Sequence, residues 1–433
     1  MNLFSQVPAG MSRRHFMKHM AGYSAMTLPA ITLTNALAAS VNELKKQGKS
    51  AILLWMGGGP STIDIWDLKP GAPTGGNFKP INTTGEGQIS EHMPEMAKLM
   101  KHMAIVRSMS TREADHNRGR YYMHTGYVPN PNVEHPSYGS VVAHELYDPK
   151  GPLEIPPFVS VGGGSVGPGF LGMSYAPFVV GSNGDVRNLN MGINQDRLES
   201  RMEMLAEIER GFVSSITGDN DPTNPKKITA ATDHAKILQK TVNLMTSKQM
   251  DAFKVNKEDK KVQERYGTSG FAKGCLMARR LVEAGVPFVE VDLGGWDNHA
   301  NVFPTLEKKL PELDMAMSAL VDDLIQRGMW KDTVVFWMGE FGRTPRINGG
   351  AGRDHWARSW SVAVGGGAFK EGVVVGKTNS DGTEVETEPY SSQDLMASVM
   401  KALGISLDTT FTARNGRPMK IANSGKVIKE LFA

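Results

Sequence analysis

The sequence has only one cysteine, Cys275, among its 433 residues. A single thiol excludes an intrachain disulfide and also excludes a structural zinc site built from several thiolates. Cys275 lies in the segment FAKGCLMARRLVEAG, whose apolar residues have the spacing of an amphipathic helix. We therefore interpret this thiol as a core side chain rather than a nucleophile.

The chain also has little net charge. Its formal charge is +3, but residues 1–39 contain Arg13, Arg14 and Lys18 and no acidic residue, so the remainder carries 3 − 3 = 0. A protein without a basic surface lacks the main source of affinity for nucleic acid, and we expect no nucleic-acid partner. The composition, 40% hydrophobic and 21% charged, is that of a globular protein with a sizeable core.

The N-terminus lacks an apolar run long and pure enough for a stable membrane span. SRRHFMK, at residues 12–18, fits the twin-arginine export consensus, and a weakly hydrophobic segment rich in Ala, Thr and Ser follows. Ala36-Leu37-Ala38 has the form of a cleavage site. We expect residues 1–39 to be a signal peptide for the twin-arginine translocase, which places the mature protein in the periplasm or outside the cell. The alternative is a lipid-anchored or transmembrane N-terminus.

Short apolar segments alternate with segments of helical periodicity along the rest of the chain. This alternation predicts an α/β fold with a mostly parallel central sheet and helices on both faces. We expect one domain over residues 40–433, with a helical insertion at about 190–266. The expected strands are 51–56, 104–110, 156–164, 286–292, 333–338 and 360–367, and the expected helices are 91–103, 117–127, 136–147, 270–284, 305–327 and 391–403.

Polar side chains follow four of these strands. Carboxylates and imidazoles without thiolates suit a divalent cation such as Zn, Ca, Mn or Mg, and arginines among them suit a phosphate or sulfate ester. The groups are Ser61, Asp64 and Asp67 after the first strand, Arg112 and Asp115 to Arg118 after the second, Asp297 to His299 after 286–292, and Glu340, Arg343, Arg353, Asp354 and His355 after 333–338.

Each of these groups has an ordinary structural alternative. Carboxylates at loop starts often form Asx turns or complement a helix dipole, and a charged pair in a glycine-rich loop is often only solvated. These alternatives apply to Asp297 with His299, to Asp64 with Asp67, and to Asp354 with His355, while Glu340 and Arg343 could form an internal ion pair.

The motifs GGGPSTIDIWDLKP, HNRGRYYMHTGY, HPSYGSVV, GGWDNH, GEFGRTP and GRDHW occur in that order across nearly the whole mature chain. Their order resembles the alkaline-phosphatase-like superfamily, which includes sulfatases, phosphodiesterases and cofactor-independent phosphoglycerate mutases. More closely, the chain resembles a sulfatase-like bacterial family of unknown function, often exported with twin-arginine leaders. The resemblance implies an alkaline-phosphatase-like fold.

The resemblance also implies metal ligands. Asp64 or Asp67 matches the Asp after the first strand, Asp297 and His299 match the Asp and His of a central strand, and His355, with Asp354 beside it, matches a late His. The spacing from Asp297 to His299 is shorter than in alkaline phosphatase. Where the superfamily usually has an Asp-His pair, this chain has Glu340 and Arg343, which puts a second metal in doubt.

The position of the superfamily nucleophile is occupied by a histidine. Counting nine residues back from the Thr of Thr125-Gly126 reaches His116, so neither a formylglycine precursor nor a hydroxyl stands there. A formylglycine sulfatase mechanism is therefore disfavoured. His116 could accept a phosphoryl or sulfuryl group, act as a general base or bind the metal. Ser110 or Thr111 would serve only if the loop register shifts.

We expect an exported, metal-dependent hydrolase of phosphate or sulfate esters. In this hypothesis Asp64, Asp297, His299 and His355, with Asp354, hold the cation, His116 is catalytic, and Arg118 or Arg343 offsets the charge of the anion. Its substrate would be an anionic ester, either a small molecule or a sulfated or phosphorylated glycan. The alternative is a non-catalytic relative that binds a metal or an anionic glycan.

Overall fold

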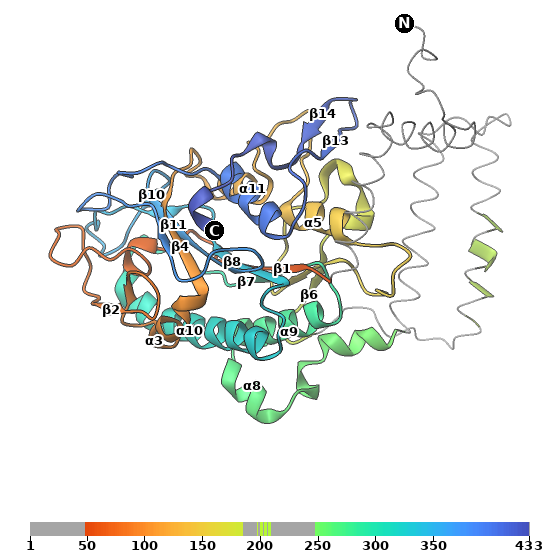
Figure 1. Ribbon diagram of the computed structural model, residues 1–433, viewed down its shortest axis with the longest axis horizontal. Helices are drawn as coiled ribbons and strands as arrows, with labels where there is room; N and C mark the ends of the chain where they lie inside the picture. Colours follow the sequence, from red (N-terminus) through yellow and green to blue (C-terminus); the bar gives the residue numbers. More distant parts are fainter. Residues whose placement is uncertain are drawn as a thin grey trace, which may run out of the picture. The chain divides into compact units, whose positions relative to one another are not determined.

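An eight-stranded sheet forms the centre of the molecule (Figure 1). The computed structural model describes residues 48–184 and 247–432 and isolated positions between 197 and 208. The strand order is β12-β4-β11-β8-β1-β7-β5-β6. In chain order the strands are β1 (Ser50–Trp55), β4 (Met103–Met109), β5 (Phe158–Val161), β6 (Phe178–Val180), β7 (Phe288–Asp292), β8 (Thr333–Met338), β11 (Trp360–Gly366) and β12 (Val374–Val375).

Within this sheet only β11 runs against its neighbours. It pairs antiparallel with both β4 and β8, whereas the pairs β1–β7, β1–β8, β5–β7, β5–β6 and β4–β12 are parallel. Every residue of β1 and of β8 is buried, as expected for apolar strands covered on both faces. The predicted α/β class with a mostly parallel sheet is confirmed.

Helices cover both faces of the sheet. A Cβ on Gly139 of α5 (Tyr138–Leu146) would lie 2.5 Å from Phe158 and 2.7 Å from Phe288, and a Cβ on Gly274 of α9 (Gly270–Glu283) would lie 2.7 Å from Val291. Phe288 and Val291 are an odd number of residues apart on β7, so they point to opposite faces. The two helices therefore lie on opposite sides, as Figure 1 shows.

The other helices and small sheets complete these layers. The helices are α3 (Pro94–Leu99), α4 (His116–Thr125), α8 (Lys260–Tyr266), α10 (Val302–Gln326) and α11 (Ser392–Ala402). Two-stranded sheets are formed by β2 (Pro80–Asn82) with β3 (Gln88–Ser90), β9 (Gly342–Arg343) with β10 (His355–Trp356), and β13 (Thr410–Thr412) with β14 (Pro418–Lys420). Within the described ranges, no helix is long and apolar enough to cross a membrane.

Some boundaries differ from the prediction for local reasons. The helix expected over 91–103 is reduced to α3, which begins at Pro94 because proline fits the first helical position, and a 3-10 turn (Met100–His102) follows it. Helix α5 begins at Tyr138 because Ser137 caps it, its side chain accepting from the backbone N–H of Ser140. Most of the insertion expected at about 190–266, and all of residues 1–39, where a signal peptide is expected, lie outside the described residues.

Strands β1, β4, β7 and β8 all point in the same direction, so their carboxyl ends share one edge of the sheet. In open α/β sheets, ligands bind outside that edge. The loops that carry the predicted site residues therefore start from neighbouring positions.

Candidate metal site

Loops from three of these strands bring three histidines around Asp297. His116 is the first residue of α4, which follows β4, and the side chain of Asp115 caps this helix. Asp297 and His299 lie in the loop after β7. His355 begins β10, which is held antiparallel to β9 beyond the end of β8. Segments far apart in the sequence thus meet at the carboxyl edge of the sheet.

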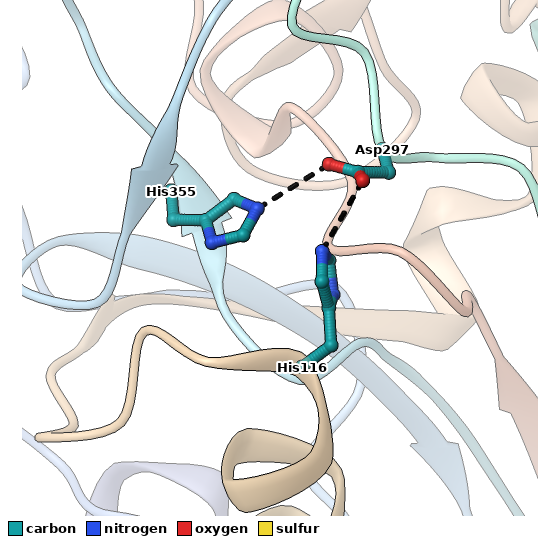
Figure 2. Close-up of side chains that lie close together, drawn as sticks. All are labelled: His116, Asp297 and His355. Carbon is teal, nitrogen blue, oxygen red and sulfur yellow. Dashed lines mark hydrogen bonds and ion pairs between the residues drawn. The ribbon is translucent and has the colours of Figure 1, made fainter.

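The three imidazoles present their Nε2 atoms to the carboxylate of Asp297. The distance from Oδ1 is 3.0 Å to Nε2 of His299 and 3.3 Å to Nε2 of His355, and Oδ2 lies 3.3 Å from Nε2 of His116. The Nε2 atoms of His299 and His355 are 3.1 Å apart. Figure 2 shows His116 and His355 approaching the two oxygens of Asp297.

Two of the rings have a fixed tautomer. Nδ1 of His355 lies 2.7 Å from the carbonyl oxygen of Ala114, and Nδ1 of His299 lies 2.6 Å from Oδ1 of Asp354. A carbonyl or a carboxylate can only accept, so each Nδ1 carries the hydrogen and each neutral ring presents an Nε2 lone pair. Two lone pairs 3.1 Å apart beside a carboxylate form a favourable position for a cation.

His116 has a partner of the same kind. Its Nδ1 lies 2.8 Å from Oε1 of Glu340, and this oxygen also accepts the backbone N–H of Gly58 at 2.8 Å. Glu340 is buried, and its other oxygen, Oε2, has no hydrogen-bond partner among the described residues. Glu340 therefore fixes the ring of His116 with Nε2 turned to Asp297.

This donor set fits a divalent cation. With metal–ligand bonds of about 2.0–2.2 Å, a tetrahedral site has neighbouring ligand atoms roughly 3.3–3.6 Å apart. The separations among Asp297 Oδ1, His299 Nε2 and His355 Nε2 are 3.0, 3.1 and 3.3 Å, close to that range. Ligand atoms of His116, Asp297 and His355 also lie within 4.8 Å of one another. Asp297 and His355 are common to both sets.

Arg343 adds a positive charge at the same point. Its Nη2 donates to Oδ1 of Asp297 at 2.6 Å, and its Nε donates to the carbonyl of Gly59 at 2.7 Å. Further bonds to the carbonyls of Gly58 and Arg353 hold the buried guanidinium in place. Arg343 therefore pairs with Asp297, not with Glu340 as the internal ion pair would require.

Asp297 is kept ionised by its neighbours. Burial alone would raise the pKa of its carboxyl, but the hydrogen bond and charge of Arg343 outweigh burial, with help from His355 and His116. The pKa of Asp297 is lowered to about 2. The carboxylate is thus charged at any pH at which the imidazoles can be neutral ligands.

Asp64 lies in a different arrangement. Its Oδ2 and Oδ1 accept from Nε and Nη2 of Arg353, both at 2.8 Å, and Oδ2 also accepts from the hydroxyl of Ser61 at 2.6 Å. Asp64 and Arg353 are 2% and 0% exposed, so the pair is inaccessible to solvent. This fork fastens the loop after β1 to the segment before β10, and the structure does not bring Asp64 into the histidine cluster.

Arg118, Thr111 and Asp354 have three different surroundings. The guanidinium of Arg118 forks the carboxylate of Glu113, from Nε at 2.6 Å and from Nη2 at 2.8 Å. The hydroxyl of Thr111 is buried without a hydrogen-bond partner among the described residues, which does not suit an attacking group. Asp354 touches His299, so the structure places it behind that imidazole.

Three roles seen in the structure were not predicted from the sequence. Glu340 orients His116, Arg353 is the partner of Asp64, and Asp292, the last residue of β7, is a half-buried carboxyl at the same sheet edge. For Asp292 a signal was present, because an acid at the end of an apolar strand is costly to bury. For Arg353 the separation of 289 residues from Asp64 leaves no local pattern.

Comparison with known proteins gives distant structural likenesses. The chain is similar to the PsFucS1 sulfatase from Pseudoalteromonas sp. (13% identity, TM-score 0.38, covering 87% of this chain and 72% of that one). It is also similar to a protein in the alkaline phosphatase superfamily from Vibrio parahaemolyticus (11% identity, TM-score 0.37, covering 89% of this chain and 70% of that one). A third similar structure is the phosphonate monoester hydrolase SpPMH from Silicibacter pomeroyi (11% identity, TM-score 0.33, covering 89% of this chain and 77% of that one).

No curated protein matches the sequence significantly. A family model described as "Protein of unknown function (DUF1501)" matches residues 48–432, almost the whole chain. The chain belongs to the DUF1501 family.

Proposed function

We propose that the protein is a metal-dependent hydrolase of phosphate or sulfate esters in which Asp297, His299 and His355 hold the cation. The observation that supports this most is the convergence of Nε2 atoms on Asp297 while each Nδ1 is already occupied. Histidines that are only solvated are not usually oriented in this way. Metal-binding histidines usually bind the ion with one ring nitrogen and donate the N–H of the other to a carboxylate or carbonyl.

The remaining groups suit the chemistry of such an ester. A bound cation would polarise the ester oxygen and acidify water. Arg343 is buried and donates to Asp297 and to backbone carbonyls, so it adds positive charge beside the bound ester without touching it. His116 can accept a proton on Nε2 while Glu340 stabilises the resulting imidazolium. In this proposal His116 is a base rather than a ligand or a covalent acceptor.

The donor set bears on which metal is bound. Two imidazole nitrogens and one carboxylate oxygen are typical of zinc or manganese, whereas calcium and magnesium prefer oxygen ligands throughout. We therefore propose zinc or manganese as the ion. Asp64 is omitted from the proposed ligand set because Arg353 occupies both of its oxygens.

The proposal is tested with purified mature protein stripped by a chelator and reloaded with zinc or manganese. Nitrophenyl phosphate, bis-nitrophenyl phosphate and nitrocatechol sulfate serve as substrates. We expect hydrolysis of at least one of them by the loaded protein and none by the stripped protein. A loaded protein that leaves all three intact would instead support a non-catalytic relative that binds the metal or an anionic glycan.

Replacing Asp354 with asparagine should weaken metal binding by about 10–100-fold, the usual effect of removing a carboxylate that orients a metal-binding histidine. The cause is loss of the 2.6 Å contact to Nδ1 of His299. Competition with a chromogenic chelator measures the affinity, and Asp408→Asn, at a side chain 95% exposed, is the control. Equal affinity in Asp354→Asn and the wild type would exclude this orienting role.

We also propose export by the twin-arginine translocase into the periplasm or beyond, supported by SRRHFMK at residues 12–18. Lysine at both Arg13 and Arg14 should retain the protein inside the cell. Unchanged export of that variant would refute the proposal.

A further inference from the structure

A second polar group, unrelated to the predicted ligands, lies at the same sheet edge. Asp292 ends β7 and is the register partner of Trp55, which ends β1. Its carboxyl has no hydrogen-bond partner among the described residues. A Cβ on Gly163 would lie 2.8 Å from Cγ of Asp292, and a Cβ on Gly57 would lie 3.6 Å from Oδ2. The two glycines thus leave room for this carboxyl.

The turn after β1 connects this carboxyl to the histidine cluster. The same Cβ on Gly57 would lie 3.4 Å from Nε1 of Trp55, and the next residue, Gly58, donates its N–H to Glu340, the partner of His116. Nε1 of Trp55 and Oε2 of Glu340 are both buried and unpaired within the described structure. Each of these two atoms can therefore form a hydrogen bond to a further polar group.

Charged groups around Asp292 determine its ionisation. Burial raises the pKa of Asp292, the charges of Glu290 and Glu340 add to this effect, and those of Arg120 and His124 oppose it. The net pKa is about 6. Lys309 of α10 also interacts with this carboxyl. The facing groups are therefore Arg120 and His124 from α4, Glu290 from β7, Glu340 after β8 and Lys309 from α10.

We propose that Asp292 is the general acid that protonates the leaving oxygen of an ester bound beside His116. This inference rests on the proposed function. The carboxyl of Asp292 lies at the carboxyl edge of the sheet without a hydrogen-bond partner, so its protonated form can donate a proton to a ligand. A carboxyl already bound by an arginine, such as that of Asp64, cannot.

The proposed step needs only the ester and one water molecule as reactants. A water oxygen forms the new bond to phosphorus or sulfur, and the bond to the leaving oxygen breaks. One water proton passes to Nε2 of His116 and the Asp292 proton passes to the leaving oxygen, which departs as an alcohol. The proton on His116 is released to solvent and Asp292 takes one up, so the net reaction is ester plus water to alcohol plus acid.

The rate of hydrolysis should depend on pH because only the protonated, neutral carboxyl of Asp292 can act as the general acid. Asp292 carries its proton below about pH 6 and loses it as the pH rises through that value. Hydrolysis of esters with poor leaving groups should therefore fall as the pH rises above about 6. Esters with good leaving groups, which need no proton, should not share this decline.

The test compares Asp292→Asn with wild-type protein, both metal-loaded, on nitrophenyl phosphate and on methyl phosphate. We expect turnover of the methyl ester to fall by about 10²–10⁴-fold, the usual contribution of a general acid. Turnover of the nitrophenyl ester should fall by less than about tenfold. Asp408→Asn is the matched control. Infrared titration of metal-free wild-type protein should show a protonated carboxyl band with a midpoint at about pH 6 that the variant lacks.

The outcomes separate the two proposals. A wild-type protein inert towards both of these esters and also towards bis-nitrophenyl phosphate and nitrocatechol sulfate would refute the proposed function and, with it, the role of Asp292. Wild-type activity with equal losses on both esters in Asp292→Asn would refute only the general acid. If the variant does not fold, absence of the infrared band in wild-type protein would also refute it.

Discussion

Replacing Arg353 with leucine is expected to lower the free energy of unfolding by about 3–5 kcal/mol. The substitution would leave the carboxylate of Asp64 buried without its partner, and isolated buried charges are costly. It would also remove bonds to the carbonyls of Thr74 and Thr344. Denaturant unfolding of the metal-free protein measures the change.

Two variants make this result specific. The double variant Asp64→Leu/Arg353→Leu should recover much of the lost stability, because neither charge then remains unpaired. Arg358→Leu, at an exposed arginine on the same segment, should change stability by no more than about 0.5 kcal/mol. A small effect of Arg353→Leu, similar to that of Arg358→Leu, would refute the assignment of Asp64 and Arg353 as a structural pair.

Replacing His116 with alanine is expected to lower turnover by about 10²–10⁴-fold while leaving the metal content unchanged, because a general base contributes that much without holding the ion. Metal analysis and turnover are measured on the same preparation. His144→Ala is the control, since that ring pairs with its neighbour Glu145 on α5.

Metal content and turnover of the His116→Ala variant together decide the role of His116. Loss of metal together with turnover would show that His116 is a ligand, in agreement with the alternative set of His116, Asp297 and His355. Unchanged turnover would refute any catalytic role for this residue.

The sequence predicts the position of those site residues that directly follow buried strands. Buried strands such as β1 and β8 are recognisable from their apolar residues, and parallel strands deliver their following loops to one edge. The closeness of Asp297, His299 and His355 was predictable for that reason. The antiparallel direction of β11 was not, because pairing partners distant in sequence leave no local signal.

Roles that depend on how loops fold and on side-chain rotamers could not be predicted from the sequence. Asp64 follows the first strand as a metal ligand should, yet the structure pairs it with Arg353, 289 residues away. Arg118 was a candidate for charge compensation, but its guanidinium is engaged by Glu113, only five residues away, through a rotamer that no periodicity predicts. The shifted pKa of Asp292 arises from burial by loops that fold over it.

Metal content tests the central claim most directly. Wild-type protein and Asp297→Asn are loaded in parallel with zinc or manganese, dialysed and analysed for bound metal. The proposed site predicts about one ion per wild-type chain and close to none in the variant, because Asp297 is the carboxylate on which the histidines converge. Equal metal content in the two proteins would contradict the assignment of Asp297 as a ligand.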